Sequence, residues 1–337
     1  MKKMRHGGRR NKVFFLASTA ALAVGVAACG SSSSSGATTT STPSKHFTIA
    51  YVPGATGVGF YNSLLAGIKT KAKSLGMSVV YQGAAAFSPS AQIPVVQGVC
   101  TNKPNLLILS PTDPVALEPA VQACIAAGIP VITTDTTLSN TSNIVAQITT
   151  NNAQGGKLAA DFVGKALNGK GEVAVLSLSP TATTQVARVQ SFESEIKSAY
   201  PNITIVATEY VGQEATSSES AVNALLLAHP NLGAVYGVAE PAAEGAAAAL
   251  QSAGKTGKVV VVGFDAGASE VKLLQAGQVQ ALVAQLPTQE GQIAAQDAYD
   301  KLTGKTSAIQ PTQQLQDVLL TTAESKLPSY AKYFYGS

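Results

Sequence analysis

The sequence has few of the residues from which metal sites are built. Its 337 residues include three histidines, three cysteines and no tryptophan, and only 12% are charged. A protein metal site needs several His or Cys ligands at short spacings, and neither His46 nor His229 has such a partner nearby. The third, His6, lies in the N-terminal leader. The sequence therefore predicts no metal site.

The usual catalytic and nucleotide-binding motifs are also missing. There is no G-x-S-x-G turn, which a hydrolase nucleophile would need. Two Gly-Lys-Thr triplets, at 254–256 and 304–306, lack the earlier glycine that a phosphate loop requires. The glycines within 54–59 do not have dinucleotide-loop spacing, and the next strand ends in Tyr81 rather than in an acid. We expect a protein that is not an enzyme and has no cofactor.

Basic residues are scarce outside the first few residues. The formal net charge is +4, but residues 1–28 hold six of the 23 Lys and Arg residues and no acid. The rest of the chain has 17 basic and 19 acidic residues. No basic stripe remains to neutralise phosphates, so the sequence predicts no nucleic-acid partner.

The N-terminus reads as an export signal followed by an anchor. Residues 1–12 are basic, and residues 13–26 form an apolar run that is too short to span a bilayer comfortably. The small residues before Cys29 resemble a bacterial lipoprotein processing box, which implies cleavage of residues 1–28 and lipidation of Cys29. Two or more acyl chains would give stable membrane attachment. The alternative is ordinary secretion with a chance cysteine.

Residues 29–45 predict a flexible linker because a Ser/Thr/Gly run cannot bury enough apolar surface to fold. No later segment has 18 uninterrupted apolar residues, so we expect the globular body to lie outside the membrane. The expected location is the outer face of the cell membrane, or the periplasm if the host has an outer membrane.

The body alternates strand and helix patterns, which predicts an α/β fold with parallel sheets covered on both faces. Nine or more strands in about 290 residues fit two doubly wound lobes better than one. The expected strands are 48–52, 77–81, 105–110, 130–135, 144–149, 172–178, 203–211, 234–238, 258–265, 279–285 and 317–322.

Two of these strands end in a carboxylate. The run KVVVVGFD at 258–265 reads as a strand buried on both faces and ends in Asp265, and PVITTD at 130–135 ends in Asp135. Ligands of open parallel sheets sit outside the carboxyl ends of the strands. Two acidic strand ends 130 residues apart therefore predict two sheets that face one cleft.

Cys100 and Cys124 each lie late in a predicted helix, and the two helices flank one strand. In an exported protein these residues form a disulfide or remain two buried thiols that pack. A disulfide would close a loop of about 25 residues and stabilise the fold by roughly 3 kcal/mol.

Taken together, these features resemble the ribose-type (type I) periplasmic sugar-binding proteins of ABC importers, over residues 47 to about 322. The motifs that carry the resemblance are FY at 60–61, SPTDP at 110–114, AGIPVI at 127–132, NNAQGG at 151–156, VGFD at 262–265 and AQLP at 284–287. The resemblance implies a monomer whose lobes close over a small ligand and dock on an ABC permease.

It also implies three crossings between the lobes, near Thr150, Leu286 and Pro311. The first lobe would comprise 46–150 and 287–311, and the second 151–286 and 312–337.

The resemblance implies a binding site made of the strand-end acids, an amide and an aromatic pair. Carboxylates accept hydroxyl protons with charge-assisted strength, and an aromatic ring suits the apolar face of a sugar. The residues are Phe60, Tyr61, Asp135, Asp265 and Gln285. Alternatively, a strand-end Asp caps the next turn, Gln285 is only a hinge residue, and one aromatic residue lies in the core.

Several positions depart from the ribose binders. Thr136 stands where the family has an arginine, and the second arginine falls at Val186, with Arg188 nearby. Family asparagines fall at Val58 and at Ala239, a family aspartate falls at Glu240, and an aromatic falls near Gln213. We therefore hypothesise a smaller, less hydroxylated or differently shaped ligand, such as a polyol, a deoxy or methylated sugar, or a neutral or cationic metabolite. We count Thr136, Arg188, Gln213 and Glu240 as further candidate ligand-binding residues.

The same fold also serves other classes of protein. A sensory receptor that signals to a membrane kinase or chemoreceptor is an alternative that this sequence does not separate from an importer. A sugar-responsive repressor would need an N-terminal helix-turn-helix, and this chain has a signal peptide there instead.

Overall fold

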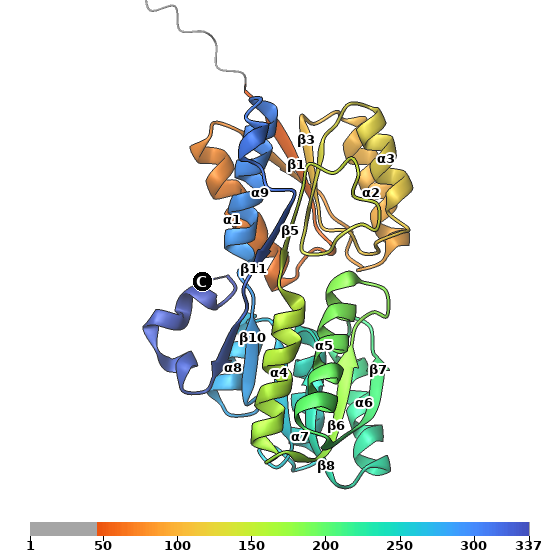
Figure 1. Cartoon of the computed structure of the whole chain (residues 1–337), viewed down its shortest axis with the longest axis vertical. Coiled ribbons are helices and arrows are strands. Elements are labelled where there is room, and N and C mark those ends of the chain that lie inside the picture. The colour runs from red at the N-terminus through yellow and green to blue at the C-terminus, as the bar shows by residue number, and fades with distance from the viewer. Residues whose placement is uncertain (1–45, 337) are drawn as a thin grey trace, which may run out of the picture. The chain divides into compact units, whose positions relative to one another are not determined.

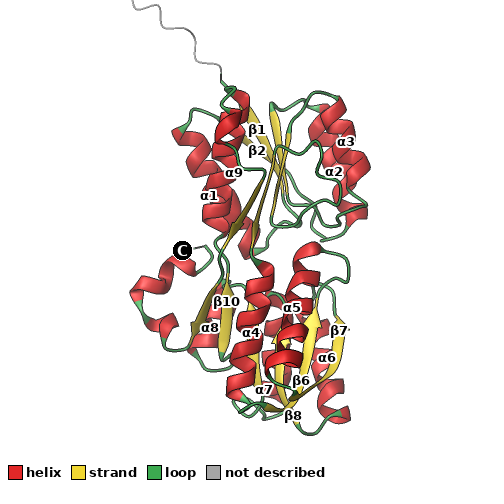
Figure 2. Cartoon of the chain, viewed as in Figure 1, coloured by secondary structure: helices red, strands yellow, loops and turns green. Residues whose placement is uncertain are grey.

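The computed structural model describes residues 46–336 (Figure 1). The predicted signal peptide 1–28, the lipidated Cys29 and the linker 29–45 lie outside these residues. Within 46–336, no helix is both long enough and apolar enough to cross a bilayer. The described body contains two six-stranded sheets, each covered by helices (Figure 2).

The first lobe is built on a fully parallel sheet. Its strands, in spatial order, are β11 (Thr312–Leu315), β5 (Ala146–Thr150), β4 (Val131–Thr134), β3 (Leu106–Leu109), β1 (Thr48–Val52) and β2 (Ser78–Tyr81). Helices α1 (Gly59–Ser74) and α9 (Pro287–Leu302) pack on one face, and α2 (Pro89–Thr101) and α3 (Glu118–Ala126) on the other.

Alternation along the strands assigns each side chain to one of these faces. Ile108 packs with the α1 and α9 side chains, whereas Leu107 packs with those of α2 and α3. Every residue of β3 is therefore buried, and the strand reads as a continuous apolar run.

Helices α1 and α9 approach unusually closely. A Cβ atom at Gly67 would collide with the carbonyl oxygen of Thr288, and one at Gly291 would collide with that of Leu64. Glycine is needed at both positions because the backbones themselves are in contact. The first helix of the first lobe, α1, is thus packed tightly against α9, with which the chain re-enters this lobe.

The second lobe has the strand order β12 (Val318–Thr321), β10 (Ala281–Ala284), β9 (Val260–Phe264), β8 (Leu232–Gly237), β6 (Lys170–Ser177) and β7 (Asn202–Tyr210). Helices α4 (Asn152–Ala166) and α5 (Thr183–Ala199) cover one face. The other face carries α6 (Ala215–Ala228), α7 (Glu240–Ser252) and α8 (Ala268–Gln275).

The structure confirms the predicted pair of doubly wound α/β lobes and corrects two details. The edge strand β12 runs antiparallel to β10, so the second sheet is mixed rather than wholly parallel. The predicted crossing near Pro311 is wrong by a few residues, because 312–315 form β11 beside β5 in the first sheet. The chain therefore crosses between Leu315 and Val318.

A disulfide joins two helices on one face of the first lobe. Cys100 in α2 and Cys124 in α3 are bonded, with their Cα atoms 5.5 Å apart. Both belong to the cluster of buried side chains beneath these helices. Of the two predicted alternatives, the structure has the disulfide.

After β12, the chain ends in two short 3-10 helices, η2 (Glu324–Lys326) and η3 (Pro328–Tyr333). Figure 1 shows this C-terminal segment beside β10, α8 and the ends of the crossing strands.

Candidate functional site

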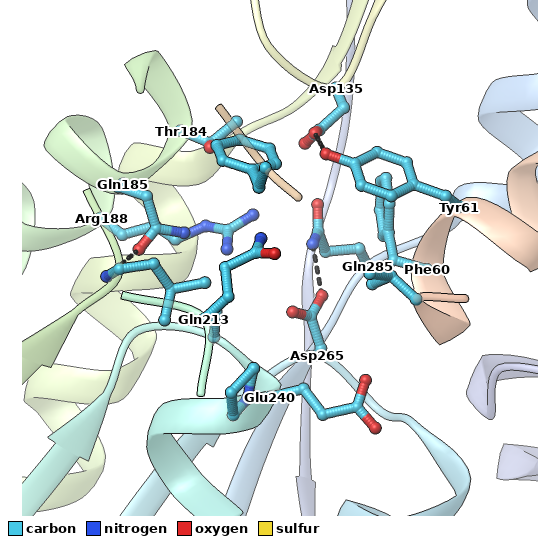
Figure 3. Close-up of a pocket in the computed structure, with 15 residues that line it drawn as sticks. Phe60, Tyr61, Asp135, Thr184, Gln185, Arg188, Gln213, Glu240, Asp265 and Gln285 are labelled. Carbon is cyan, nitrogen blue, oxygen red and sulfur yellow. Dashed lines mark hydrogen bonds between the residues drawn. The ribbon is translucent and has the colours of Figure 1, made fainter. Parts of the chain in front are cut away.

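Asp135 and Asp265 line one cavity of about 120 Å³ from different lobes (Figure 3). Asp135 follows β4 of the first sheet, and Asp265 follows β9 of the second. The other lining residues are Val58, Phe60, Tyr61, Phe87, Leu178, Thr184, Gln185, Arg188, Gln213, Ala239, Glu240, Pro241 and Gln285. The carboxyl ends of two opposed sheets therefore meet at a shared pocket.

Asp135 is fixed by its backbone and by a neighbouring tyrosine. Its φ of 62° lies in the left-handed region, which Asp tolerates better than most residues. Its Oδ2 accepts a 2.8 Å hydrogen bond from the hydroxyl of Tyr61. Burial raises the pKa of Asp135 to about 6, while Arg188 and the bond from Tyr61 act in the opposite direction. This carboxyl group thus titrates close to neutral pH.

A second acid lies behind Asp135. The backbone N–H of Asp135 donates to Oε1 of Glu290, which belongs to the first turn of α9 and is fully buried. Burial, with the charge of Asp135 as a smaller contribution, raises the pKa of Glu290 well above its ordinary value. Sequence reasoning missed Glu290, because an acid in the first turn of a helix ordinarily needs only the helix dipole as its partner.

Asp265 is also in the left-handed region, with a φ of 97°. Its Oδ1 accepts hydrogen bonds from Nε2 of Gln285 at 2.6 Å and from the hydroxyl of Tyr335 at 3.1 Å. Within residues 46–336 no hydrogen bond is made to Oδ2 of Asp265, so this oxygen can accept further donors. Gln285 follows β10 at the second crossing, so a hinge residue orients the strand-end carboxylate.

The aromatic pair lies at the start of α1. The rings of Phe60 and Tyr61 meet edge to face, with centroids 5.3 Å apart at 83°. Both residues are buried in a hydrophobic core cluster, and both also line the pocket. Phe87 adds a third ring to the same wall.

Arg188 brings a positive charge into the pocket from α5. Its side chain is 2% exposed, and its guanidinium carbon lies 3.6 Å from the ring centroid of Phe264. Nε donates to Oδ1 of Asn152 at 2.7 Å, and Nη1 donates to the carbonyl oxygen of Val238 at 3.1 Å. The pocket therefore contains one arginine beside its carboxyl groups, and this arginine is one of the candidate residues named from the sequence.

Gln213 and Glu240, two of the candidate residues, line the pocket. Glu240 is half-buried and accepts a 3.2 Å bond from the hydroxyl of Ser269. Burial, followed by the charges of Asp265 and Glu244, raises the pKa of Glu240 to about 7.

Thr136 lies outside this pocket, contrary to the prediction. It is 1% exposed, and its hydroxyl donates to the carbonyl oxygen of Pro111. A side chain held in this way secures the turn after β4 and does not reach the cavity.

Two polar residues of the pocket were missed. Thr184 and Gln185 start α5 directly after the loop that leaves β6. Oε1 of Gln185 accepts from the hydroxyl of Ser177 and from the N–H of Leu178, each at 3.1 Å. Ligands of parallel sheets bind beyond the carboxyl ends of the strands, and β6 is one of these strands. Applying this rule to β6 would have predicted both Thr184 and Gln185.

The described part of the chain, 46–336, contains no group of three or more His, Cys, Asp or Glu residues placed to hold a metal ion. Its pocket instead combines carboxylates, amides, one guanidinium and three aromatic rings. Such a set of groups suits a ligand that carries several hydroxyls and a flat apolar face.

Comparisons with known proteins agree with this arrangement. Residues 49–306 match the periplasmic binding protein domain. The ribose import binding protein of Salmonella typhimurium is 32% identical over 258 residues, which are 77% of this chain and 86% of that protein. The protein of the same name from Bacillus subtilis is 30% identical over 261 residues, 77% of this chain and 83% of that protein.

Among solved structures, an ABC transporter solute-binding protein from Agrobacterium vitis with bound alpha-D-tagatopyranose is similar to this chain. It superposes with a TM-score of 0.84 at 30% identity, covering 86% of this chain and 100% of that one. With two doubly wound lobes, a cavity between their strand ends and these matches, the chain belongs to the periplasmic binding protein family, as a type I sugar-binding protein of ABC transporters.

Proposed function

We propose that the protein is a solute-binding protein that captures a sugar or polyol between its lobes and delivers it to an ABC permease. The observation that carries this proposal is the shared pocket of Asp135 and Asp265, which come from the tips of opposed sheets. The family implies an extracytoplasmic location, and its characterised members bind and transport their substrates rather than transform them.

The chemistry of the pocket suits a polyhydroxylated ligand. The two carboxylates accept hydroxyl protons, and Arg188 and Gln213 supply donors to ligand oxygens. The rings of Phe60, Tyr61 and Phe87 offer an apolar wall for the C–H face of a sugar. Because these groups are already held by one another, little ordering is needed when the ligand binds.

Contacts between the lobes support a mechanism in which closure follows binding. The N–H of Thr137 in the first lobe donates to Oγ1 of Thr183 in the second at 3.1 Å. Glu240 of the second lobe approaches Gly59 of the first, where a Cβ atom would lie 3.6 Å from its Oε2. A ligand that contacts both strand ends favours the form in which these contacts exist, and the permease would recognise that form.

The pocket favours a neutral ligand over a charged one because Arg188 offsets part of the acidic charge. Relatives are named for ribose, and a similar structure holds tagatose. Val58 and Ala239 stand at positions where ribose binders have asparagines, so we propose a ligand with fewer hydroxyls than ribose or a different shape.

Isothermal titration of residues 46–337 with a panel of neutral ligands tests the proposal. The panel comprises D-ribose, D-allose, D-tagatose, D-arabinose, 2-deoxy-D-ribose, D-fucose, ribitol and xylitol. We expect at least one of them to bind with a dissociation constant of about 1 µM or tighter. Binding of none of the eight would contradict the function, and tight binding of D-ribose would contradict the proposed ligand preference.

We further propose that Cys29 carries the lipid that anchors the protein to the outer face of the membrane. The processing box at 26–30 and the Ser/Thr/Gly linker after it support this proposal. Mass spectrometry of the N-terminal peptide from membrane fractions should find residues 1–28 removed and Cys29 acylated. A Cys29→Ser protein should lose the acyl mass and leave the membrane, and an unmodified Cys29 in the wild type would contradict the anchor.

A further inference from the structure

The C-terminal segment 322–336 touches both lobes and reaches the binding site. It lies beyond the family match, which ends at residue 306, so the family resemblance assigns no role to it. Figure 1 shows it beside β10, α8 and the ends of the crossing strands, and its last turns lie near the hinge. Its contacts fall into three groups: with the second lobe, with the first lobe, and with the pocket.

The second lobe holds the segment at both of its ends. The hydroxyl of Thr322 donates to the carbonyl oxygen of Leu274 at 3.1 Å. Nε2 of Gln275 donates to the carbonyl oxygen of Ser325 at 3.1 Å. Near the terminus, the N–H of Tyr335 donates to the carbonyl oxygen of Ala266 at 2.9 Å. The segment is therefore bound to α8 and to the turn that follows β9.

The first lobe is contacted through α1. The N–H of Gly336 donates to the hydroxyl of Ser63 at 3.0 Å. The rings of Tyr335 and Phe60 meet edge to face, with centroids 6.0 Å apart at 72°. Phe60 is a pocket residue, so the segment connects the aromatic wall of the first lobe to the turn that carries Asp265.

The side chain of Tyr335 ends directly behind the pocket. It is 5% exposed, and its hydroxyl donates to Oδ1 of Asp265 and accepts from the N–H of Gln285, each at 3.1 Å. One hydroxyl thus joins the strand-end acid to the hinge residue. With Oδ1 held by two donors, the rotamer of Asp265 is fixed and Oδ2 is presented to the cavity.

We propose that segment 322–336 is a strap across the hinge and that Tyr335 is a positioning residue for ligand recognition by Asp265. This proposal rests on the proposed function for its binding part. Tyr335 does not line the cavity and acts through Asp265 and Gln285. Because the strap contacts α1 as well, its contacts favour the arrangement in which both halves of the pocket are assembled.

The test uses Tyr335→Phe, which removes only the hydroxyl, with Tyr333→Phe in the same segment as the matched control. The first readout is the hydrogen-exchange rate of the backbone amide of Gln285, measured by NMR on residues 46–337 in the absence of ligand. Loss of the Tyr335 acceptor should speed exchange of this amide about tenfold. The amide of Asp265, which donates to the carbonyl oxygen of Val283, should stay protected in both variants.

The second readout is isothermal titration with the same eight sugars and polyols that test the proposed function. For any of these ligands that binds, Tyr335→Phe should weaken affinity about tenfold, and Tyr333→Phe should leave it unchanged. In an Asp265→Asn background, Tyr335→Phe should weaken affinity by less than about twofold, because the carboxylate that Tyr335 positions has already been replaced. A purely structural role would give the same loss in both backgrounds.

Unchanged exchange at Gln285 in Tyr335→Phe would overturn the strap contact. Faster exchange with unchanged affinity, or an equal loss in the Asp265→Asn background, would overturn the positioning role. If none of the eight ligands binds the wild type, that result counts against the proposed function alone, and the exchange rate still decides whether Tyr335 holds Gln285.

Discussion

The two lobes hold the same group, a carboxylate at a strand end, in different ways. Asp135 receives its hydrogen bond from Tyr61, a residue of its own lobe and of the aromatic wall. Asp265 receives its bonds from Gln285 at the hinge and from Tyr335 at the end of the chain. The first carboxylate is thus supported locally, whereas the second depends on segments that also connect the lobes.

A shared feature makes this difference informative. Behind each strand end lies a fully buried glutamate that accepts a backbone N–H, Glu290 from Asp135 and Glu270 from Gly267. Burial raises the pKa of both glutamates well above the ordinary value. The two glutamates hold different residues, since Glu290 accepts the N–H of the strand-end Asp135 and Glu270 accepts that of Gly267, two positions after Asp265. The side-chain donors to the two carboxylates differ as well, and only those of Asp265 include a residue at a crossing between the lobes.

The lobes also differ in covalent bonding, and this difference carries the largest expected effect. The first lobe has the Cys100–Cys124 disulfide, and the second contains no cysteine. A Cys100→Ala/Cys124→Ala protein should lose about 3 kcal/mol of unfolding free energy, because its unfolded first lobe gains loop entropy. Denaturant titration followed by fluorescence measures the loss, and isothermal titration should show unchanged affinity. An equal stability in the two proteins would show that the disulfide does not stabilise the first lobe.

Removal of either strand-end carboxylate should have the next largest effect. Asp135→Ala and Asp265→Ala should each weaken sugar binding about 100-fold, since each removes charge-assisted bonds to hydroxyls. Asp161→Ala, in α4 and away from the pocket, is the matched control and should bind normally. Titration calorimetry gives the three affinities. A loss at only one strand end would break the equivalence of the two lobes.

The pH dependence of binding sharpens the comparison further. The pKa of Asp135 is raised to about 6, so the stability that its protonation gives the unliganded protein is complete below about pH 4 and is lost as the pH rises through 6. A ligand that donates a hydroxyl to ionised Asp135 should therefore bind about tenfold more tightly at pH 7 than at pH 5. Titrations in buffers of different ionisation enthalpy should show proton release at the lower pH.

Asp135→Asn should flatten this pH profile, and Glu240→Gln should remove any part that centres near pH 7. A profile that survives in both variants would assign the pH dependence to another group.

Much of the fold could be predicted because short apolar runs mark most of the strands, and their alternation with helices indicates parallel sheets. The four valines before Gly263 mark β9, and the acid after them marks the site. β11 was missed because its sequence, TQQL, is polar and mostly exposed at a sheet edge, so no apolar run indicates it. The crossing was consequently placed a few residues too early.

The site was predictable only where a residue follows a strand or matches a family motif. Arg188 was a candidate because it is close in sequence to Val186, where the family has an arginine. Its stacking on the ring of Phe264 results from the packing of α5 on the sheet, which the sequence does not indicate. Tyr335 had no local signal, because it meets Asp265 across 70 residues of chain and matches no motif. Thr136 shows the opposite error, since the position where the resemblance places a ligand arginine holds a threonine whose hydroxyl donates to the carbonyl oxygen of Pro111 and anchors a turn.

The glycine contacts between α1 and α9 limit how the protein can move. Helix α9 starts directly after the crossing at Leu286, and α1 carries Phe60 and Tyr61. With backbone touching backbone at Gly67 and Gly291, no compressible side chains separate the two helices. A rotation of the chain at Leu286 would then move α9 and α1 together as one rigid pair. Phe60 and Tyr61, which α1 carries, would move with them.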